Sequence, residues 1–271
     1  MYLTRHQSDD GPVWARDGRL LPASFTLADW LGQPAAEGSE YLEQLETSGS
    51  APDALLAPIE PLIEVWACGV TYLRSRDARM AESTVNDIYE RVYMAQRAEV
   101  FFKAPGWRAV GHGSTIRVRR DSSWSVPEPE LVLVFNSTLE IVGYCAGNDV
   151  SSRSIEGENP LYLPQAKSFD GACAIGPGIV LAPAEAMRDL AIGLSIVRDG
   201  AEIFEGKTST LALKRTLEEL VAFTGAELSF PYGGLLMTGT GIVPSDEFSL
   251  QPGDRVTITV GDLVLQNDVA S

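Results

Sequence analysis

Two glutamates at a spacing of two residues form the most chemically informative pattern in this sequence. Glu128 and Glu130 are separated by one proline and lead into the apolar run 131–135. In a strand, residues two apart project from the same face, about 7 Å from one another. Like charges placed in this way repel each other and favour a cation between them. The alternative interpretation is an exposed strand face bordered by prolines.

A third carboxylate and a lysine follow this pair. Asp149 comes directly after the turn-forming residues Gly147 and Asn148, and Lys167 lies further along the chain. Three carboxylates without a thiolate or an imidazole are typical ligands of a hard cation that keeps positions open for water and substrate. Glu128, Glu130 and Asp149 would therefore suit Mg²⁺, with Mn²⁺ or Ca²⁺ possible, but their spacing alone leaves the exposed strand face open as the alternative.

The elements that must position these residues are mostly strands. Strands are expected at 63–70, 131–135, 141–144, 190–197, 201–204, 255–260 and 263–265, and helices at 74–94 and 211–224. The pairs 131–135 with 141–144 and 190–197 with 201–204 are hairpin candidates, the second through an Asp-Gly turn. Many strands, few helices and no alternation of the two predict a β-rich α+β fold rather than a dinucleotide-binding sheet.

The first 60 residues have a different pattern and are expected to form a small N-terminal α/β appendage. Turn signals separate short strands near 13–15 and 19–21, and helical stretches follow at 27–31 and 40–47. The segment 48–52 is predicted to be a linker. Residues 61–271 would then form the catalytic domain.

Composition excludes several classes of partner. The chain has 21 basic and 37 acidic residues, a net charge of −16, so a nucleic-acid partner is not expected. No run approaches the roughly 20 apolar residues of a membrane span, and the N-terminus lacks the layout of a signal peptide. Cys68, Cys145 and Cys173 are scattered and odd in number, which favours buried free thiols and a cytoplasmic protein.

Longer stretches resemble the fumarylacetoacetate hydrolase superfamily over residues 60–271. They are 128–130, 143–153, 159–170, 236–241 and 252–254. The resemblance implies a β-roll catalytic domain in which Glu128, Glu130 and Asp149 hold Mg²⁺. It also implies a small-molecule 2-oxo acid substrate that chelates the metal, and an assembly into a homodimer or homotetramer.

One departure from the superfamily pattern narrows the expected reaction. The small acylpyruvate hydrolases carry a histidine on the lid that helps to activate water, and Ser75 stands at the matching position here. The chain has two histidines, of which His6 lies near the terminus and His112 lies in a Gly-His-Gly turn. A carbon–carbon hydrolase would therefore lack its usual base, unless His112 or a glutamate substitutes.

The sequence resembles the branch of 2-keto-3-deoxy-D-arabinonate dehydratases more than it resembles the acylpyruvate hydrolases, and this resemblance extends to the stretch 98–103. That resemblance implies dehydration of 2-keto-3-deoxy-D-arabinonate or xylonate to 2,5-dioxopentanoate, with Glu99 and Lys167 as catalytic residues beside the metal. Lys167 would be the base for the C3 proton or a cation that stabilises the enolate. Glu99 would pass a proton to the leaving hydroxyl. The alternatives are a lysine salt-bridged to the metal carboxylates and an ordinary exposed glutamate.

Substrate-binding residues are expected in two further segments. Ser151, Ser152 and Arg153 follow Asp149, where they would bind the substrate carboxylate or order the loop. Thr238 and Thr240 lie in a glycine-rich turn, where they would bind substrate oxygens or only shape the turn.

Other functions remain open from the sequence alone. Within the superfamily they are an acylpyruvate hydrolase, a 2-oxoacid decarboxylase and a dienoate hydratase. A non-catalytic binding protein, whose metal only holds a loop, is the alternative from another class. The presence of Glu99 and Lys167 together with all three carboxylates argues against that last interpretation.

Overall fold

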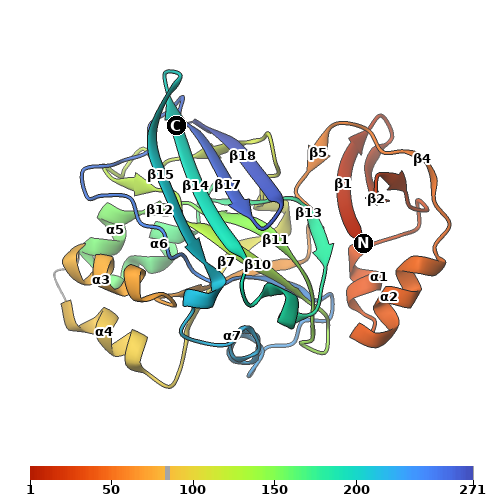
Figure 1. The fold of residues 1–271 in the computed structure, drawn as a ribbon, viewed down its shortest axis with the longest axis horizontal. Helices are drawn as coiled ribbons and strands as arrows, with labels where there is room; N and C mark the ends of the chain where they lie inside the picture. The colour runs from red at the N-terminus through yellow and green to blue at the C-terminus, as the bar shows by residue number, and fades with distance from the viewer. Residues whose placement is uncertain (83–85, 271) are drawn as a thin grey trace.

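The computed structural model describes residues 1–82 and 86–270 and consists mainly of antiparallel strands (Figure 1). Within these residues, the strands form an 11-stranded sheet, a five-stranded sheet and a two-stranded ribbon. This confirms the predicted β-rich α+β class. No helix in the described ranges combines the length and the apolar character that crossing a lipid bilayer requires.

The larger sheet carries the acidic residues noted above. Six of its strands lie side by side in the order β13-β11-β10-β16-β6-β7. These strands are β6 (Glu64–Gly69), β7 (Glu99–Pro105), β10 (Pro129–Phe135), β11 (Ile141–Asp149), β13 (Cys173–Leu181) and β16 (Gly234–Met237). Strands β10 and β11 form the predicted hairpin, and every residue of β10 is buried. The apolar run suits this position because both faces of the strand are covered.

The five-stranded sheet lies over this centre, in the order β15-β14-β17-β18-β8. Its strands are β8 (Thr115–Arg117), β14 (Ala191–Arg198), β15 (Ala201–Ser209), β17 (Arg255–Val260) and β18 (Leu263–Ala270). Buried residues alternate along β17 and β18, as expected for strands with one face toward a core. Strands β14 and β15 confirm the second predicted hairpin, and β17 with β18 confirms the C-terminal pair. The core lies between the two sheets and includes Leu133, Ile196 and Ile258.

The N-terminal segment continues the larger sheet. Its elements are β1 (Tyr2–Ser8), β2 (Gly11–Arg16), β3 (Arg19–Leu20), α1 (Leu27–Leu31), α2 (Ala35–Gln44), β4 (Ser48–Ser50) and β5 (Leu55–Leu56). Strand β1 pairs with β13, so the appendage is hydrogen-bonded to the sheet beneath the site. The predicted linker at 48–52 is wrong at its start, because β4 pairs with β3 as an exposed edge strand. The division of the chain near residue 60 stays a proposal.

Helices cover the end of the molecule opposite α1 and α2 (Figure 1). They are α3 (Leu73–Glu82), α4 (Asn86–Met94), α5 (Arg153–Glu158) and α6 (Leu163–Lys167). The helix predicted over 74–94 thus corresponds to α3 and α4, and its residues 83–85 lie outside the described residues. The ribbon of β9 (Ser125–Val126) and β12 (Ser151–Ser152) lies beside α5 and α6.

The helix predicted over 211–224 begins later than expected. Residues Thr210–Ala212 form a 3-10 turn, and α7 spans Leu217–Thr224. Thr216 caps α7 in a reciprocal capping box with Glu219, which fixes the first residue of the helix. Leu213 is extended and bridges to Tyr72, so the apolar spacing before Thr216 does not continue as a helix. Further 3-10 turns span Gly106–Arg108, Pro160–Tyr162 and Ala184–Met187.

Candidate active site and metal centre

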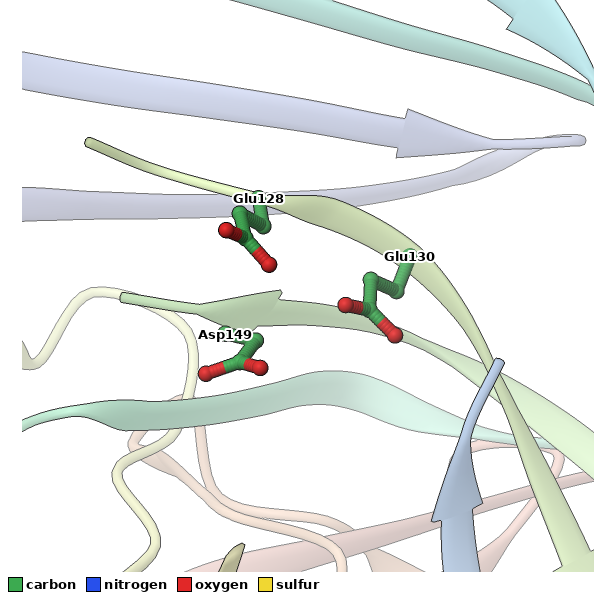
Figure 2. Close-up of side chains that lie close together, drawn as sticks. All are labelled: Glu128, Glu130 and Asp149. Carbon is green, nitrogen blue, oxygen red and sulfur yellow. The ribbon is translucent and has the colours of Figure 1, made fainter. Parts of the chain in front are cut away.

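Two neighbouring strands bring the three predicted carboxylates together. In the β10–β11 register, Pro129 faces Asn148 and Glu130 faces Gly147, and the N–H of Asp149 donates to the carbonyl of Glu128 (3.0 Å). One oxygen from each of Glu128, Glu130 and Asp149 lies within 4.8 Å of the other two. Figure 2 shows the three side chains turned toward a common space between their strands. The spacing of two residues therefore does place both glutamates on one face.

The three carboxylates need nearby positive charge, which the protein's own lysines and arginine or a metal ion can supply. All three side chains are at least 97% buried, so their charges are poorly solvated. Burial, and then the nearby charges of Asp149 and Glu128, raise the pKa of Glu130 well above its usual range. Three buried carboxylate oxygens converging at this separation are the donor set that a hard divalent cation prefers. The residues present therefore fit a Mg²⁺ ion.

Each carboxylate is also held by a donor from the protein. Arg153 forms an ion pair with Oε1 of Glu128 (3.1 Å), and the N–H of Gly239 donates to Oε2 of Glu130 (2.5 Å). The backbone of Gly239 has a φ of +89°, which a glycine adopts without strain. Lys103 forms an ion pair with Oδ1 of Asp149.

Lys167, the last residue of α6, reaches the same carboxylates from the other side. Its Nζ donates to Oε2 of Glu128 (2.7 Å), to Oδ2 of Asp149 (3.0 Å) and to the hydroxyl of Ser151 (2.6 Å). Lys167 is 3% exposed, and its three donors each have an oxygen acceptor, which is the arrangement of an ammonium group. The salt bridge that the sequence left as an alternative is thus present.

Glu99 begins β7 and faces the same space. It pairs with Gly69 on β6, where a Cβ atom would lie 2.1 Å from Oε2 of Glu99. The missing side chain at Gly69 therefore makes room for this carboxylate. Ser75, which stands where the hydrolase histidine is expected, donates its hydroxyl to the carbonyl of Tyr72 (2.8 Å).

One cavity joins these residues. Among the described residues, its lining consists of Cys68, Gly69, Val70, Ser75, Glu99, Phe101, Glu128, Glu156, Leu163, Lys167, Gly239 and Thr240. Both predicted catalytic residues thus face one metal carboxylate, Glu128, across a shared space. The two histidines lie elsewhere: His6 contacts Thr4, and His112 contacts β18.

The predicted substrate-binding residues occupy different places. Thr240 lines the cavity, and Ser151 accepts from Lys167. Ser152 donates to Ser122 (2.7 Å) and caps α5, whereas Thr238 donates to the carbonyl of Leu131 (3.0 Å). The hydroxyls of Ser152 and Thr238 therefore hold the backbone around the site, and a role for them in substrate binding stays a prediction.

Lys103 and Glu156 are site residues that the sequence analysis did not identify. Lys103 is the extra residue of a bulge in β7, because its neighbours Phe102 and Ala104 pair with consecutive residues of β6. A bulge re-aims a side chain, which strand periodicity does not predict. A single lysine within an apolar strand was the available signal, because a buried cation needs a partner. Glu156 lies one helical turn after Arg153 in α5, so both side chains can face the site.

The chain was compared with known proteins. A family model described as fumarylacetoacetate (FAA) hydrolase C-terminal matches residues 65–270. A protein of Haloferax volcanii named Probable 2-keto-3-deoxyxylonate dehydratase is 49% identical over 210 residues, which are 77% of this chain and 72% of that protein. A Saccharolobus solfataricus protein named 2-dehydro-3-deoxy-D-arabinonate dehydratase is 41% identical over 231 residues, which are 83% and 77% of the two chains.

A solved structure has a similar fold over nearly the full length of this chain. It is described as 2-keto-3-deoxy-D-arabinonate dehydratase complexed with magnesium and 2,5-dioxopentanoate, and it is 35% identical to this chain, with a TM-score of 0.84. The match covers 99% of this chain and 98% of that one. Together with the family match over most of the sequence, this confirms the expected β-roll. The chain belongs to the fumarylacetoacetate hydrolase family.

Proposed function

We propose that this protein is a Mg²⁺-dependent dehydratase that converts 2-keto-3-deoxy-D-arabinonate or its xylonate-derived equivalent to 2,5-dioxopentanoate. The observation that carries the proposal is the single cavity in which Glu99 and Lys167 face the carboxylate of Glu128, itself part of the buried acidic cluster. The names of both curated relatives and the product bound in the solved structure support the same reaction.

The charges around the cavity support a divalent cation. Among the described residues, five carboxylates lie at the cavity or in the adjoining acidic cluster, against three cations from lysine and arginine. The carboxylates are those of Glu99, Glu128, Glu130, Asp149 and Glu156. Their formal charges leave an excess of two negative charges, which one divalent ion neutralises. Glu128, Glu130 and Asp149 would hold it. When bound, Mg²⁺ supplies a Lewis acid that stabilises negative charge on the C2 oxygen of a 2-oxo acid.

The substrate would lie in the cavity with its 2-oxo acid end toward the acidic cluster. Thr240 lines the cavity and offers a hydroxyl to substrate oxygens, and Arg153 and Ser151 stand beside the cluster. A divalent cation would compete with the ammonium of Lys167 for the oxygens of Glu128 and Asp149. Lys167 would then turn toward C3 of the substrate.

Two of the chain's residues would move the protons. Lys167, displaced from the carboxylates and deprotonated to the neutral amine, would take a proton from C3. Glu99, in its protonated form, would give a proton to the C4 hydroxyl as the C–O bond breaks, so that water leaves. The electron pair of the C3–H bond forms the new C3–C4 double bond. Further proton shifts convert the C5 alcohol to an aldehyde. C4 is reduced as C5 is oxidised, so the reaction needs no redox cofactor.

Metal removal and substrate identity test this function. The protein, first treated with EDTA and desalted, should not form 2,5-dioxopentanoate from 2-keto-3-deoxy-D-arabinonate, and added Mg²⁺ should restore the reaction. A rate of product formation that changes neither with EDTA nor with added Mg²⁺ would overturn the metal dependence. Cleavage of acylpyruvates at a higher kcat/KM than dehydration would favour the hydrolase instead.

We also propose a cytoplasmic location and a homo-oligomer, either a dimer or a tetramer. The three cysteines are free and buried, which suits a reducing compartment. Leu62, Trp107 and Leu161 are large apolar side chains that are at least 60% exposed and offer surface for contacts between protomers. Light scattering coupled to size-exclusion chromatography would measure the mass, and a monomer would contradict the assembly.

A further inference from the structure

In each carboxylate of the acidic cluster, one oxygen lies against a positively charged or N–H group of the protein, through an ion pair in Glu128 and Asp149 and a hydrogen bond in Glu130. We call these the outer oxygens: Oε1 of Glu128, Oε2 of Glu130 and Oδ1 of Asp149. Their partners are Arg153, the N–H of Gly239 and Lys103. The three partners come from α5, from the turn after β16 and from β7, so separate elements hold the three carboxylates.

In Glu128 and Asp149, the remaining oxygen faces a residue that lines the cavity. Oε2 of Glu128 and Oδ2 of Asp149 both contact the Nζ of Lys167, which itself lines the cavity. Glu130 is held through Oε2 by the N–H of Gly239, a residue that also lines the cavity. One oxygen from each carboxylate lies within 4.8 Å of the other two, which leaves a common centre for an ion.

The donors on the outer oxygens are fixed in place. Lys103 is 1% exposed, and its Nζ also donates to the carbonyls of Val150 (3.3 Å) and Lys167. Arg153 is 2% exposed at the start of α5. The third donor is a backbone N–H. Because buried cations repel a second cation, Lys103 and Arg153 also keep a metal ion away from the oxygens that they contact.

We propose that these three donors limit each carboxylate to a single metal bond, and that the site thereby selects Mg²⁺ over Ca²⁺. Mg²⁺ requires six ligands in near-ideal octahedral geometry, whereas Ca²⁺ takes six to eight and uses carboxylates in the bidentate mode. Three protein oxygens, two oxygens of a 2-oxo acid and one water would supply six. The inference rests on the proposed function only in that a divalent metal binds here.

Lys103→Met tests the inference because it releases Oδ1 of Asp149 while keeping a side chain of similar length. Removing the lysine charge should strengthen the binding of Mg²⁺ and of Ca²⁺ alike, so a change in either affinity alone does not test the inference. The ratio of the two affinities does. The dissociation constants of Mg²⁺ and Ca²⁺ are measured by calorimetry on the metal-free protein without substrate. The unmodified protein should bind Mg²⁺ more tightly than Ca²⁺. In Lys103→Met that preference should fall by ~10-fold or more, the scale for loss of an outer-shell partner.

Lys167→Met is the matched control. It removes an ammonium from the same cluster, but from the two oxygens that are offered to the metal. Both ions should gain affinity, and their ratio should stay at the value of the unmodified protein. Should Lys103→Met fail to fold, Arg153→Met releases Oε1 of Glu128 and should shift the ratio in the same direction.

The outcomes separate this inference from the proposed function. Tighter binding of Ca²⁺ by the unmodified protein would overturn the inference and leave a metal-dependent dehydratase in place. An unchanged ratio in folded Lys103→Met, or in Arg153→Met, would also overturn it. Absence of binding of either ion to the unmodified protein would instead refute the metal centre itself.

Discussion

Lys167→Met is the substitution whose consequences the structure defines in most detail. The ammonium contacts Glu128 at 2.7 Å and Asp149 at 3.0 Å, and all three side chains are at most 4% exposed. Deleting one partner of a buried ion pair costs ~3–5 kcal/mol, because the remaining charges lose their compensation. For a chain of this size, 1 kcal/mol shifts Tm by roughly 2–4 °C, so the metal-free variant should melt roughly 6–20 °C lower.

Mg²⁺ should reverse much of this loss. A divalent ion restores positive charge beside Glu128 and Asp149, so added Mg²⁺ should raise Tm more in Lys167→Met than in the unmodified protein. Turnover should nevertheless fall by at least ~10²-fold at saturating Mg²⁺, the scale expected when a proton-transfer group is deleted. The two effects separate the role of the ammonium in the metal-free cluster from its role in the reaction.

Thermal denaturation with EDTA or Mg²⁺, together with exchange of the C3 hydrogens in D₂O followed by NMR, provides the assay. Lys207→Met is the matched control, because Lys207 is paired with Glu205 but is 78% exposed, and exposed pairs contribute ~0–1 kcal/mol. Lys207→Met should keep Tm and turnover. Unchanged Tm and turnover in Lys167→Met would refute the reasoning. Exchange at C3 that persists while product formation stops would make Lys167 an electrostatic stabiliser rather than the base.

Three further predictions concern the metal, pH and the choice of reaction. Glu128→Gln should fold but lose most Mg²⁺ affinity and nearly all activity, because a hard cation needs the anionic oxygen, and normal calorimetric binding would contradict the ligand assignment. Burial and the charges of Asp149 and Glu128 raise the pKa of Glu130, so the folded metal-free protein holds a proton that the unfolded chain has lost. Its stability should therefore fall as pH rises above the ordinary glutamate range toward that raised pKa, while Mg²⁺ affinity rises, and a Tm series in EDTA that climbs across that window would refute this sign. Acylpyruvate cleavage should be weaker than dehydration by orders of magnitude, because Ser75 stands where the hydrolase histidine is expected and a serine hydroxyl cannot act as a base without a neighbour to take its proton. Ser75→His should not improve dehydration. Faster acylpyruvate cleavage in a direct comparison of kcat/KM would reverse this conclusion.

The acidic cluster was predictable because short-range rules determine it. Glu128 directly precedes β10, and side-chain alternation places it on the same face as Glu130. The hairpin to β11 brings Asp149 beside them. Glu99 and Lys167 entered through family resemblance, since they lie on β7 and α6, and their proximity depends on the tertiary fold.

The residues that sequence reasoning missed depend on irregular backbone or on long-range contacts. Lys103 reaches Asp149 through a bulge that no periodicity reveals. The apolar pattern of the predicted helix 211–224 includes Leu211 and Leu213, yet Leu213 pairs with Tyr72 in extended form and the helix starts only after the Thr216 cap. Ser48–Ser50 have the composition of a linker, but hydrogen bonds to β3 make them a strand.

The identity of the product tests the central claim most directly. The protein with Mg²⁺ is incubated with 2-keto-3-deoxy-D-arabinonate, and the mixture is analysed by mass spectrometry and proton NMR, with Glu128→Gln as the inactive control. The account predicts a product lighter than the substrate by one water, with a new aldehyde proton that corresponds to 2,5-dioxopentanoate. Unchanged substrate, or shorter acids from cleavage of a carbon–carbon bond, would contradict it.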